Sequence, residues 1–199
     1  MQRIVLTLSL ALSAAALVGA TAALPAQQRV TVDLRAAAAA PTQKLATTEL
    51  DVGIGFGGTV AFRLQQHLHL YAGWDWMHFQ ADDSFAGSDM DFEETGYTFG
   101  LRFEHPFRGE SGGLAYRLEG GGTFKHIEIE DDEGEAIADS EHGLGYEAGA
   151  ALLLPLGSTW RFTPGLRYRS LDRDFRIGSA TTDASLRYVA LELGVSRRF

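Results

Sequence analysis

Residues Glu49 to Leu64 read ELDVGIGFGGTVAFRL, and apolar side chains occupy almost every second position of this stretch. These positions are Leu50, Val52, Ile54, Phe56, Val60, Phe62 and Leu64. A period of two predicts a β-strand with one apolar and one polar face. The run is much longer than the roughly 5–6 residues usual for strands in soluble proteins. The fold therefore depends on which solvent each face of such a strand meets.

The same alternation recurs along the chain and predicts eight strands. They are expected at residues 29–35, 49–64, 68–78, 94–104, 114–125, 144–154, 160–169 and 187–199. The shorter connections are 65–67, 105–113 and 155–159. The longer, polar connections are 36–48, 79–92, 126–143 and 170–184, and the alanine run 36–40 is a candidate helical turn. Short and long connections alternate, so we expect short turns at one end of the strands and long loops at the other.

The first residues have the composition of a secretory signal. Arg3 precedes an apolar segment from Ile4 to Val18, and the small residues Ala20 to Ala22 form a cleavage site of the A-x-A type. We expect a signal peptide at 1–22 and one barrel domain at 23–199; the alternative is a short membrane anchor. No other segment reaches the roughly 18 consecutive apolar residues of a transmembrane helix.

Composition narrows the function classes. The formal net charge of −9 argues against a nucleic-acid partner, because phosphate groups need a basic surface. The sequence has no cysteine, which excludes disulfide bonds. Glycine provides 23 of 199 residues, about 12 % against a usual ~7 %, so side chains or backbones must be crowded somewhere.

Two closed barrels fit the alternation. A soluble lipocalin-like barrel places its apolar face inside around a ligand, whereas a membrane barrel places it outside against lipid. The apolar face carries many large rings, and the interior of an eight-stranded barrel is only wide enough for ordinary side chains. The polar face is rich in glycine, which inside a narrow barrel makes room for charged side chains. The sequence therefore predicts an all-β, eight-stranded antiparallel up-and-down transmembrane β-barrel.

Aromatic residues support this orientation, because they gather at two levels as in the interfacial girdles of membrane barrels. Near the short turns lie Phe62, Phe103, Tyr116, Trp160, Phe162 and Phe199. Toward the long loops lie Trp74, Trp76, Tyr97, Phe124, Tyr146 and Tyr168.

Three segments, LYAGWDWM, YRLEGGGTFK and the ending LELGVSRRF, resemble the transmembrane domain of outer membrane protein A and its small-barrel relatives. The resemblance covers residues 29–199. It implies a location in the Gram-negative outer membrane and a structural or surface-interaction role. In that family a terminal aromatic residue is read by the outer-membrane assembly machinery. Phe199 matches this pattern together with Val195, Leu193 and Leu191, whereas Arg197 departs from it.

The polar face also predicts ion pairs in the interior. If the turn at 155–159 pairs Leu154 with Trp160, Glu147 lies opposite Arg167. If Phe107 faces Leu114, two further pairs follow. These are Glu104 with Arg117 and Arg102 with Glu119. An unpaired charge is costly in a narrow, poorly hydrated interior, so we expect these pairs to plug the lumen. The alternative is that the charges sit in interior water and pair loosely.

Two groups of residues are candidate metal sites. His67 and His69 form an H-x-H motif near a turn, but His105 falls on the outward face of its strand, so no third ligand converges. The acidic segment from Glu128 to His142 lacks the spacing of an EF-hand. We expect a solvated, mobile loop there; the alternative is weak Ca²⁺ or Mg²⁺ binding that bridges lipopolysaccharide phosphates.

Catalysis needs a nucleophile, a base and an orienting acid within reach. His126, Ser140, Glu141 and His142 cluster in sequence, but Ile127 and Glu128 follow His126, so the H-x-S motif of lipid A deacylases is missing. The sequence therefore favours a monomeric structural or surface-interaction barrel without a cofactor, metal site or catalytic residue. Its expected partners are outer-membrane lipids, including lipopolysaccharide, and the assembly machinery, while an extracellular partner stays unspecified. The alternatives are a narrow pore or transport protein and, less favoured, a lipid-modifying enzyme.

Overall fold

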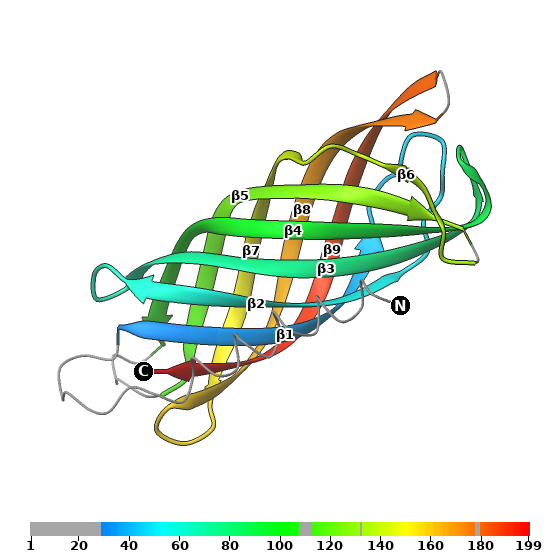
Figure 1. Cartoon of the computed structure of the whole chain (residues 1–199). Helices are drawn as coiled ribbons and strands as arrows, with labels where there is room; N and C mark the ends of the chain where they lie inside the picture. Colours follow the sequence, from blue (N-terminus) through cyan, green and yellow to red (C-terminus); the bar gives the residue numbers. More distant parts are fainter. Residues whose placement is uncertain (1–28, 108–112, 132, 178–179) are drawn as a thin grey trace, which may run out of the picture.

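The computed structural model describes residues 29–107, 113–131, 133–177 and 180–199 (Figure 1). The predicted signal peptide at 1–22 lies outside these residues. The strands are β1 (Val30–Pro41), β2 (Gly53–Arg63), β3 (Leu68–Ser84), β4 (Gly87–Pro106), β5 (Ala115–Glu130), β6 (Ala136–Asp139), β7 (Gly143–Pro155), β8 (Trp160–Ile177) and β9 (Ala180–Arg198). Among the described residues, no helix has the length and apolar character needed to cross a membrane.

The strands close into a ring of eight. The sheet order is β4-β3-β2-β1-β9-β8-β7-β5-β6, and an additional β4–β5 pairing joins its ends. The pairing of β5 with β7 ends at Lys125, and the short β6 pairs with β5 further along, at residues 128–130. The β6 strand is therefore not one of the eight strands of the ring. The predicted eight-stranded antiparallel barrel is therefore confirmed. Closure leaves no open sheet edge in the ring, as hydrocarbon surroundings require.

Several predicted loops are strands instead. Residues 79–92 belong to a β3–β4 hairpin whose turn is Phe85–Ala86, and residues 170–177 and 180–184 extend β8 and β9. The alanine run at 36–40 lies in β1 and is not a helical turn. The strand predicted from residue 49 begins only at Gly53. Figure 1 shows these long hairpins rising beyond one end of the barrel, opposite the short turns.

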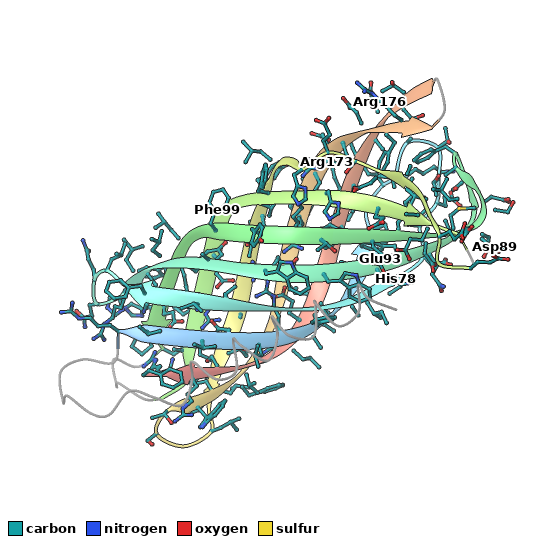
Figure 2. All side chains as sticks on the ribbon, in the orientation of Figure 1. His78, Asp89, Glu93, Phe99, Arg173 and Arg176 are labelled. Atoms are coloured by element: carbon teal, nitrogen blue, oxygen red, sulfur yellow. The ribbon has the colours of Figure 1, made fainter. Side chains whose placement is uncertain are left out.

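The apolar face points outward in the middle of the barrel. Leu34, Ile54 and Phe56 are 62 %, 61 % and 55 % exposed, while the neighbouring Asp33 and Gly57 are buried. Figure 2 shows Phe99 pointing away from the wall in the same belt. An apolar outer surface of this extent belongs in lipid.

Beyond the belt the polarity of the two faces is reversed. Inward side chains of the long hairpins are apolar and 0–1 % exposed, among them Phe79, Phe92, Ile127, Ile129 and Phe175. They form a core with Met77, Ala81, Leu171, Leu186 and Tyr188. The β1–β2 connection also contributes Leu45, which is fully buried. The structure is thus a membrane barrel that continues into a barrel with an apolar core like that of a soluble protein, a feature not predicted from the sequence.

Candidate functional site

The lumen of the membrane belt contains one connected network of ion pairs. Inward positions on seven strands supply eight basic and seven acidic residues, linked by N–O distances of at most 4.0 Å. They are Arg35, Arg102, Arg117, Lys125, Arg161, Arg167, Arg169, Arg198, Asp33, Asp75, Glu94, Glu104, Glu119, Glu147 and Glu192. Strands β1, β3, β4, β5, β7, β8 and β9 carry these residues. We call this set the lumen network.

Two predicted pairs lie directly opposite each other across β4 and β5. Phe107 N–H donates to the Leu114 carbonyl, and the register counted from this turn is the one that the strands adopt. Arg102 Nε donates to Glu119 Oε1 at 2.5 Å. Arg117 donates to Glu104 Oε1 through Nε at 3.0 Å and Nη2 at 2.8 Å.

The third predicted pair rested on a wrong register. Glu147 lies opposite Arg169, not Arg167, because Leu154 pairs with Phe162 and the strands are shifted by two residues. Leu156 N–H donates to the Trp160 carbonyl, so the turn is tighter than the sequence suggested, and Gly157 adopts a φ of 98° within it. Arg167 nevertheless reaches Glu147 diagonally, with Nη1 to Oε1 at 2.9 Å.

Glu147 accepts four hydrogen bonds within the lumen network. Besides Arg167, Arg169 Nη2 donates to its Oε2 at 2.7 Å, and Tyr71 Oη donates to its Oε1 at 2.7 Å. Thr98 Oγ1 also donates to Oε1. With 2 % of the residue exposed, this carboxylate has exchanged water for four protein donors.

Sequence reasoning missed several residues of the lumen network. Asp33 in β1 accepts from Arg102 Nη1 at 2.6 Å and Arg117 Nη1 at 2.9 Å, and so joins the two predicted β4–β5 pairs. Asp75 in β3 contacts Arg35, Arg169 and Lys125. Both carboxylates have inward parity on strands whose other face is apolar, and this signal was enough to assign them to the interior.

Little space remains between these side chains. A cavity of about 20 Å³ lies among Asp33, Arg102, Arg117, Glu119 and Arg167, with room for one water molecule. The cost of desolvating so many charges is offset only by close pairing and good geometry. The lumen network can therefore hold the strands in register through ion pairs that link seven strands.

Phe199 lies at the seam where β9 meets β1. Its N–H donates to the Val30 carbonyl at 2.8 Å, and Val30 N–H donates back to the Phe199 carbonyl at 3.3 Å. The Arg197 guanidinium lies 4.7 Å from the Phe199 ring centre and 5.4 Å from that of Trp160. Arg197, which departs from the family pattern, thus bridges two aromatic residues of the short-turn end.

The residues weighed for metal binding and catalysis do not converge. The ring centres of His67 and His105 lie 4.7 Å apart with the ring planes tilted by 35°, whereas His69 points into the lumen. Across the described ranges, no group of three or more potential ligands could hold a metal ion.

The residues weighed for lipid modification lie near one another, but they are engaged with other partners. His126 Nδ1 lies 2.7 Å from Asp139 Oδ1, and His142 stacks on His126 at 4.3 Å. Ser140 is 4 % exposed, and its Oγ accepts the N–H of Ile127 at 2.8 Å. The Ser140 hydroxyl is therefore engaged by the backbone, and the imidazole of His126 is directed to a different partner.

Comparison with known proteins relates the whole fold to one class. The outer membrane protein beta-barrel domain family matches residues 5–199. Similar solved structures include OprG from Pseudomonas aeruginosa (13 % identity, 86 % of this chain and 96 % of that chain covered, TM-score 0.61). Another is Neisserial surface protein A (18 % identity, 85 % of this chain and 96 % of that chain covered, TM-score 0.55). A third is outer membrane protein W of E. coli (13 % identity, 86 % of this chain and 98 % of that chain covered, TM-score 0.52). No curated protein matches the sequence. At these identities the structural likenesses establish the fold alone.

Proposed function

Because the chain belongs to the outer membrane protein beta-barrel domain family, and so to the Gram-negative outer membrane, we propose that it is a structural or surface-interaction barrel with a closed lumen. The observation that carries this proposal is the continuous lumen network. Ions need a hydrated path through a pore, and the cavity of about 20 Å³ within the network has room for about one water molecule.

A second closure lies in series with the first. Phe79 packs on Tyr188 at 5.3 Å between ring centres, and Phe175 packs on Phe85 at 5.6 Å. Thr48 links the β1–β2 connection to the β3–β4 hairpin, because its Oγ1 accepts the N–H of Phe85 at 3.1 Å. The apolar core thus supports a barrel that is closed at the hairpin end as well.

The long hairpins support a role at the cell surface. In barrels of this class the short turns are periplasmic and the longer connections extracellular. Asp89 and Arg176 lie near the tips of two hairpins in Figure 2, and the exposed acidic residues Asp82, Asp83, Glu133 and Glu135 lie at the same end. We assign to this acidic rim the contacts with lipopolysaccharide, whose phosphates divalent cations can bridge to carboxylates. The assembly machinery reads Phe199, and the barrel, closed on itself, works as a monomer.

Planar-bilayer conductance tests the closed lumen. The wild-type protein should add no conductance to the bare bilayer. Two closures in series predict that Glu147→Ala with Arg167→Ala stays closed, and that Phe79→Ala with Phe175→Ala stays closed. The combination of all four changes should leak. Stable channels from the wild-type protein would instead establish the pore alternative.

The surface role is tested in cells. Removal of the gene should increase detergent sensitivity or reduce adhesion, and a copy with shortened β3–β4 and β8–β9 hairpins should not restore the lost property. Mass spectrometry of lipid A should give identical spectra with and without the protein. A changed acyl or phosphate pattern would contradict this proposal and favour lipid modification.

A further inference from the structure

The short-turn mouth of the lumen holds buried side-chain nitrogens without hydrogen-bond partners. Arg161 is 7 % exposed and its Nη1 has no hydrogen-bond partner. His69 is 6 % exposed and its Nδ1 has none either. An unsatisfied buried polar group costs free energy, and a buried cation costs more. Two such groups at one mouth therefore need an explanation.

In the described part of the chain, Glu104 is the carboxylate that pairs with the basic residues of this mouth. Glu104 Oε2 accepts from Arg198 Nη2 at 3.1 Å, and Arg161 Nη1 lies 4.0 Å away from the same oxygen, too far for a hydrogen bond. The other oxygen of Glu104 is taken by Arg117. Among the described residues, Arg161 has no other carboxylate within 4.0 Å. The lumen network has one more basic than acidic residue, and this surplus lies here.

His69 stands in the same basic environment. Its cross-strand neighbours are Arg63 in β2 and Arg102 in β4. It also lies within electrostatic range of Glu104, Arg117 and Arg198. The ring thus faces more guanidinium groups than carboxylates, and an anion is the ligand that would complete its surroundings.

We propose that Arg161, Arg198 and His69 form a binding site for a small tetrahedral oxyanion, phosphate or a phosphate monoester, at the short-turn mouth. Guanidinium groups present planar pairs of N–H donors that match phosphate oxygens, and a protonated imidazole nitrogen adds one more donor. The three side chains come from β8, β9 and β3, so their donors approach from different sides. A tetrahedral anion can satisfy three such directions, whereas a planar carboxylate offers only two oxygens.

Inorganic phosphate is the probe for this site. The refolded protein is studied in alkyl maltoside micelles, which contain no phosphate, at an ionic strength kept constant with chloride. Phosphate should shift the NMR signals of the His69 ring saturably and raise Tm by about 3–6 °C at a tenfold excess over Kd. Acetate at the same concentration should have no such effect. Absence of saturation, or an equal response to acetate or chloride, would overturn the proposal.

Two variants with the same charge change separate binding from general electrostatics. Arg161→Gln should weaken phosphate binding at least about tenfold, whereas Arg176→Gln at the opposite end should leave it unchanged. Without phosphate, Arg161→Gln should not lower Tm, because it removes a buried cation that has no hydrogen-bonded partner. A variant that fails to fold, or one that binds phosphate like the wild type, would contradict the assignment of Arg161.

Discussion

Arg167 binds Glu147 at 2.9 Å although the two residues are not partners across the strands. Arg167 lies opposite Gly149, and Glu147 lies opposite Arg169. A Cβ atom at residue 149 would lie 3.7 Å from the Arg167 guanidinium carbon, an ordinary van der Waals contact, so the Arg167 side chain leans diagonally past this position. Arg167 can thereby contact Glu119 and Glu192 as well. One arginine thus links carboxylates from three strands.

This contact predicts energetic coupling between the two residues. Glu147→Ala should destabilise the barrel by ~3–5 kcal/mol, because it leaves buried guanidinium groups unpaired. The double change with Arg167→Ala should cost less than the sum of the single changes by ~1–3 kcal/mol. It should still be destabilising, since Arg169 and Glu192 also lose a partner. Urea unfolding of the refolded protein measures all four states of the cycle.

Lys44 and Glu49 provide the matched control. Their ion pair is also short, 2.8 Å, but the side chains are 57 % and 78 % exposed. The same cycle there should give a coupling of at most ~1 kcal/mol. Equal couplings at the two sites would mean that burial does not strengthen the lumen pair.

Two adjacent glycines should respond differently to alanine. A Cβ on the inward Gly121 would lie 2.8 Å from the Gly100 Cα and would collide with the Phe99 carbonyl oxygen, both on the neighbouring strand. A Cβ on the outward Gly120 would meet nothing within 4 Å. Gly121→Ala should therefore cost ~1–3 kcal/mol, and Gly120→Ala less than ~0.5 kcal/mol, in the same unfolding assay. Similar costs would show that the two strands separate readily.

Removal of the Phe199 side chain should impair assembly. The ring stacks under Arg197 next to the seam that closes the barrel. Phe199→Ala should lower the fraction of folded protein in outer-membrane preparations, whereas Phe199→Tyr should assemble like the wild type. The folded fraction is measured on gels as the fast-migrating band that disappears when the sample is heated. Phe107→Ala, which removes an exposed ring from the same end, is the control. Normal assembly of the Phe199→Ala variant would exclude a role for the terminal ring.

Protease treatment of intact cells tests the orientation of the barrel. Glu133 and Glu135 are exposed in the turn after β5, where Asp131 N–H donates to the Glu135 carbonyl at 3.1 Å. A protease of broad specificity should cut there in intact cells. Residues 79–92, expected to be cleaved if they were a loop, should resist because they are paired strands around Phe79 and Phe92. Cleavage only after the outer membrane is breached would invert the topology.

Neutralising Glu130 should stabilise the extracellular extension at pH 7. Glu130 lies beyond the aromatic girdle, opposite Asp91, and burial together with Glu93, Glu128 and Asp91 raises its pKa. An acid with a raised folded-state pKa stabilises the fold when protonated and loses this contribution as pH rises through that value. Glu130→Gln should thus gain ~0.2–1 kcal/mol at pH 7, and the gain should vanish below the unfolded-state pKa of about 4.5. An unchanged free energy of unfolding for Glu130→Gln at pH 7 would contradict this prediction.

Alternation alone was enough to predict the ring of strands and the inward position of every predicted ion-pair residue. It could not set the β7–β8 register, because a period of two fixes pairing only up to shifts of two residues. The tight turn at Gly157 decided that shift, and its φ of 98° is not visible in the pattern. Across β4 and β5 the assumed Phe107–Leu114 pair was right, and both ion pairs followed.

The hairpin extensions were missed for another reason. In β3 the odd-numbered residues point inward throughout, from Tyr71 to Ala81. In the part of β3 that faces lipid, the outward-pointing even positions are apolar. From Met77 onward, the inward-pointing odd positions are apolar instead. When apolar residues change from even to odd positions within one strand, the alternation is interrupted, and the interruption resembles the end of the strand. The exchange of lipid for water on the outer face is its physical cause.

The connectivity of the lumen network constrains how this sequence can diverge. Most residues of the lumen network form ion pairs with two or more others. A substitution at one of them therefore leaves unpaired charges on residues of neighbouring or distant β-strands. Interior positions can therefore change only in compensating sets, whereas each lipid-facing residue can be exchanged for another apolar one independently. Descendants of this chain should keep a nearly fixed interior inside a freely drifting exterior, the reverse of the usual relation between core and surface in soluble enzymes.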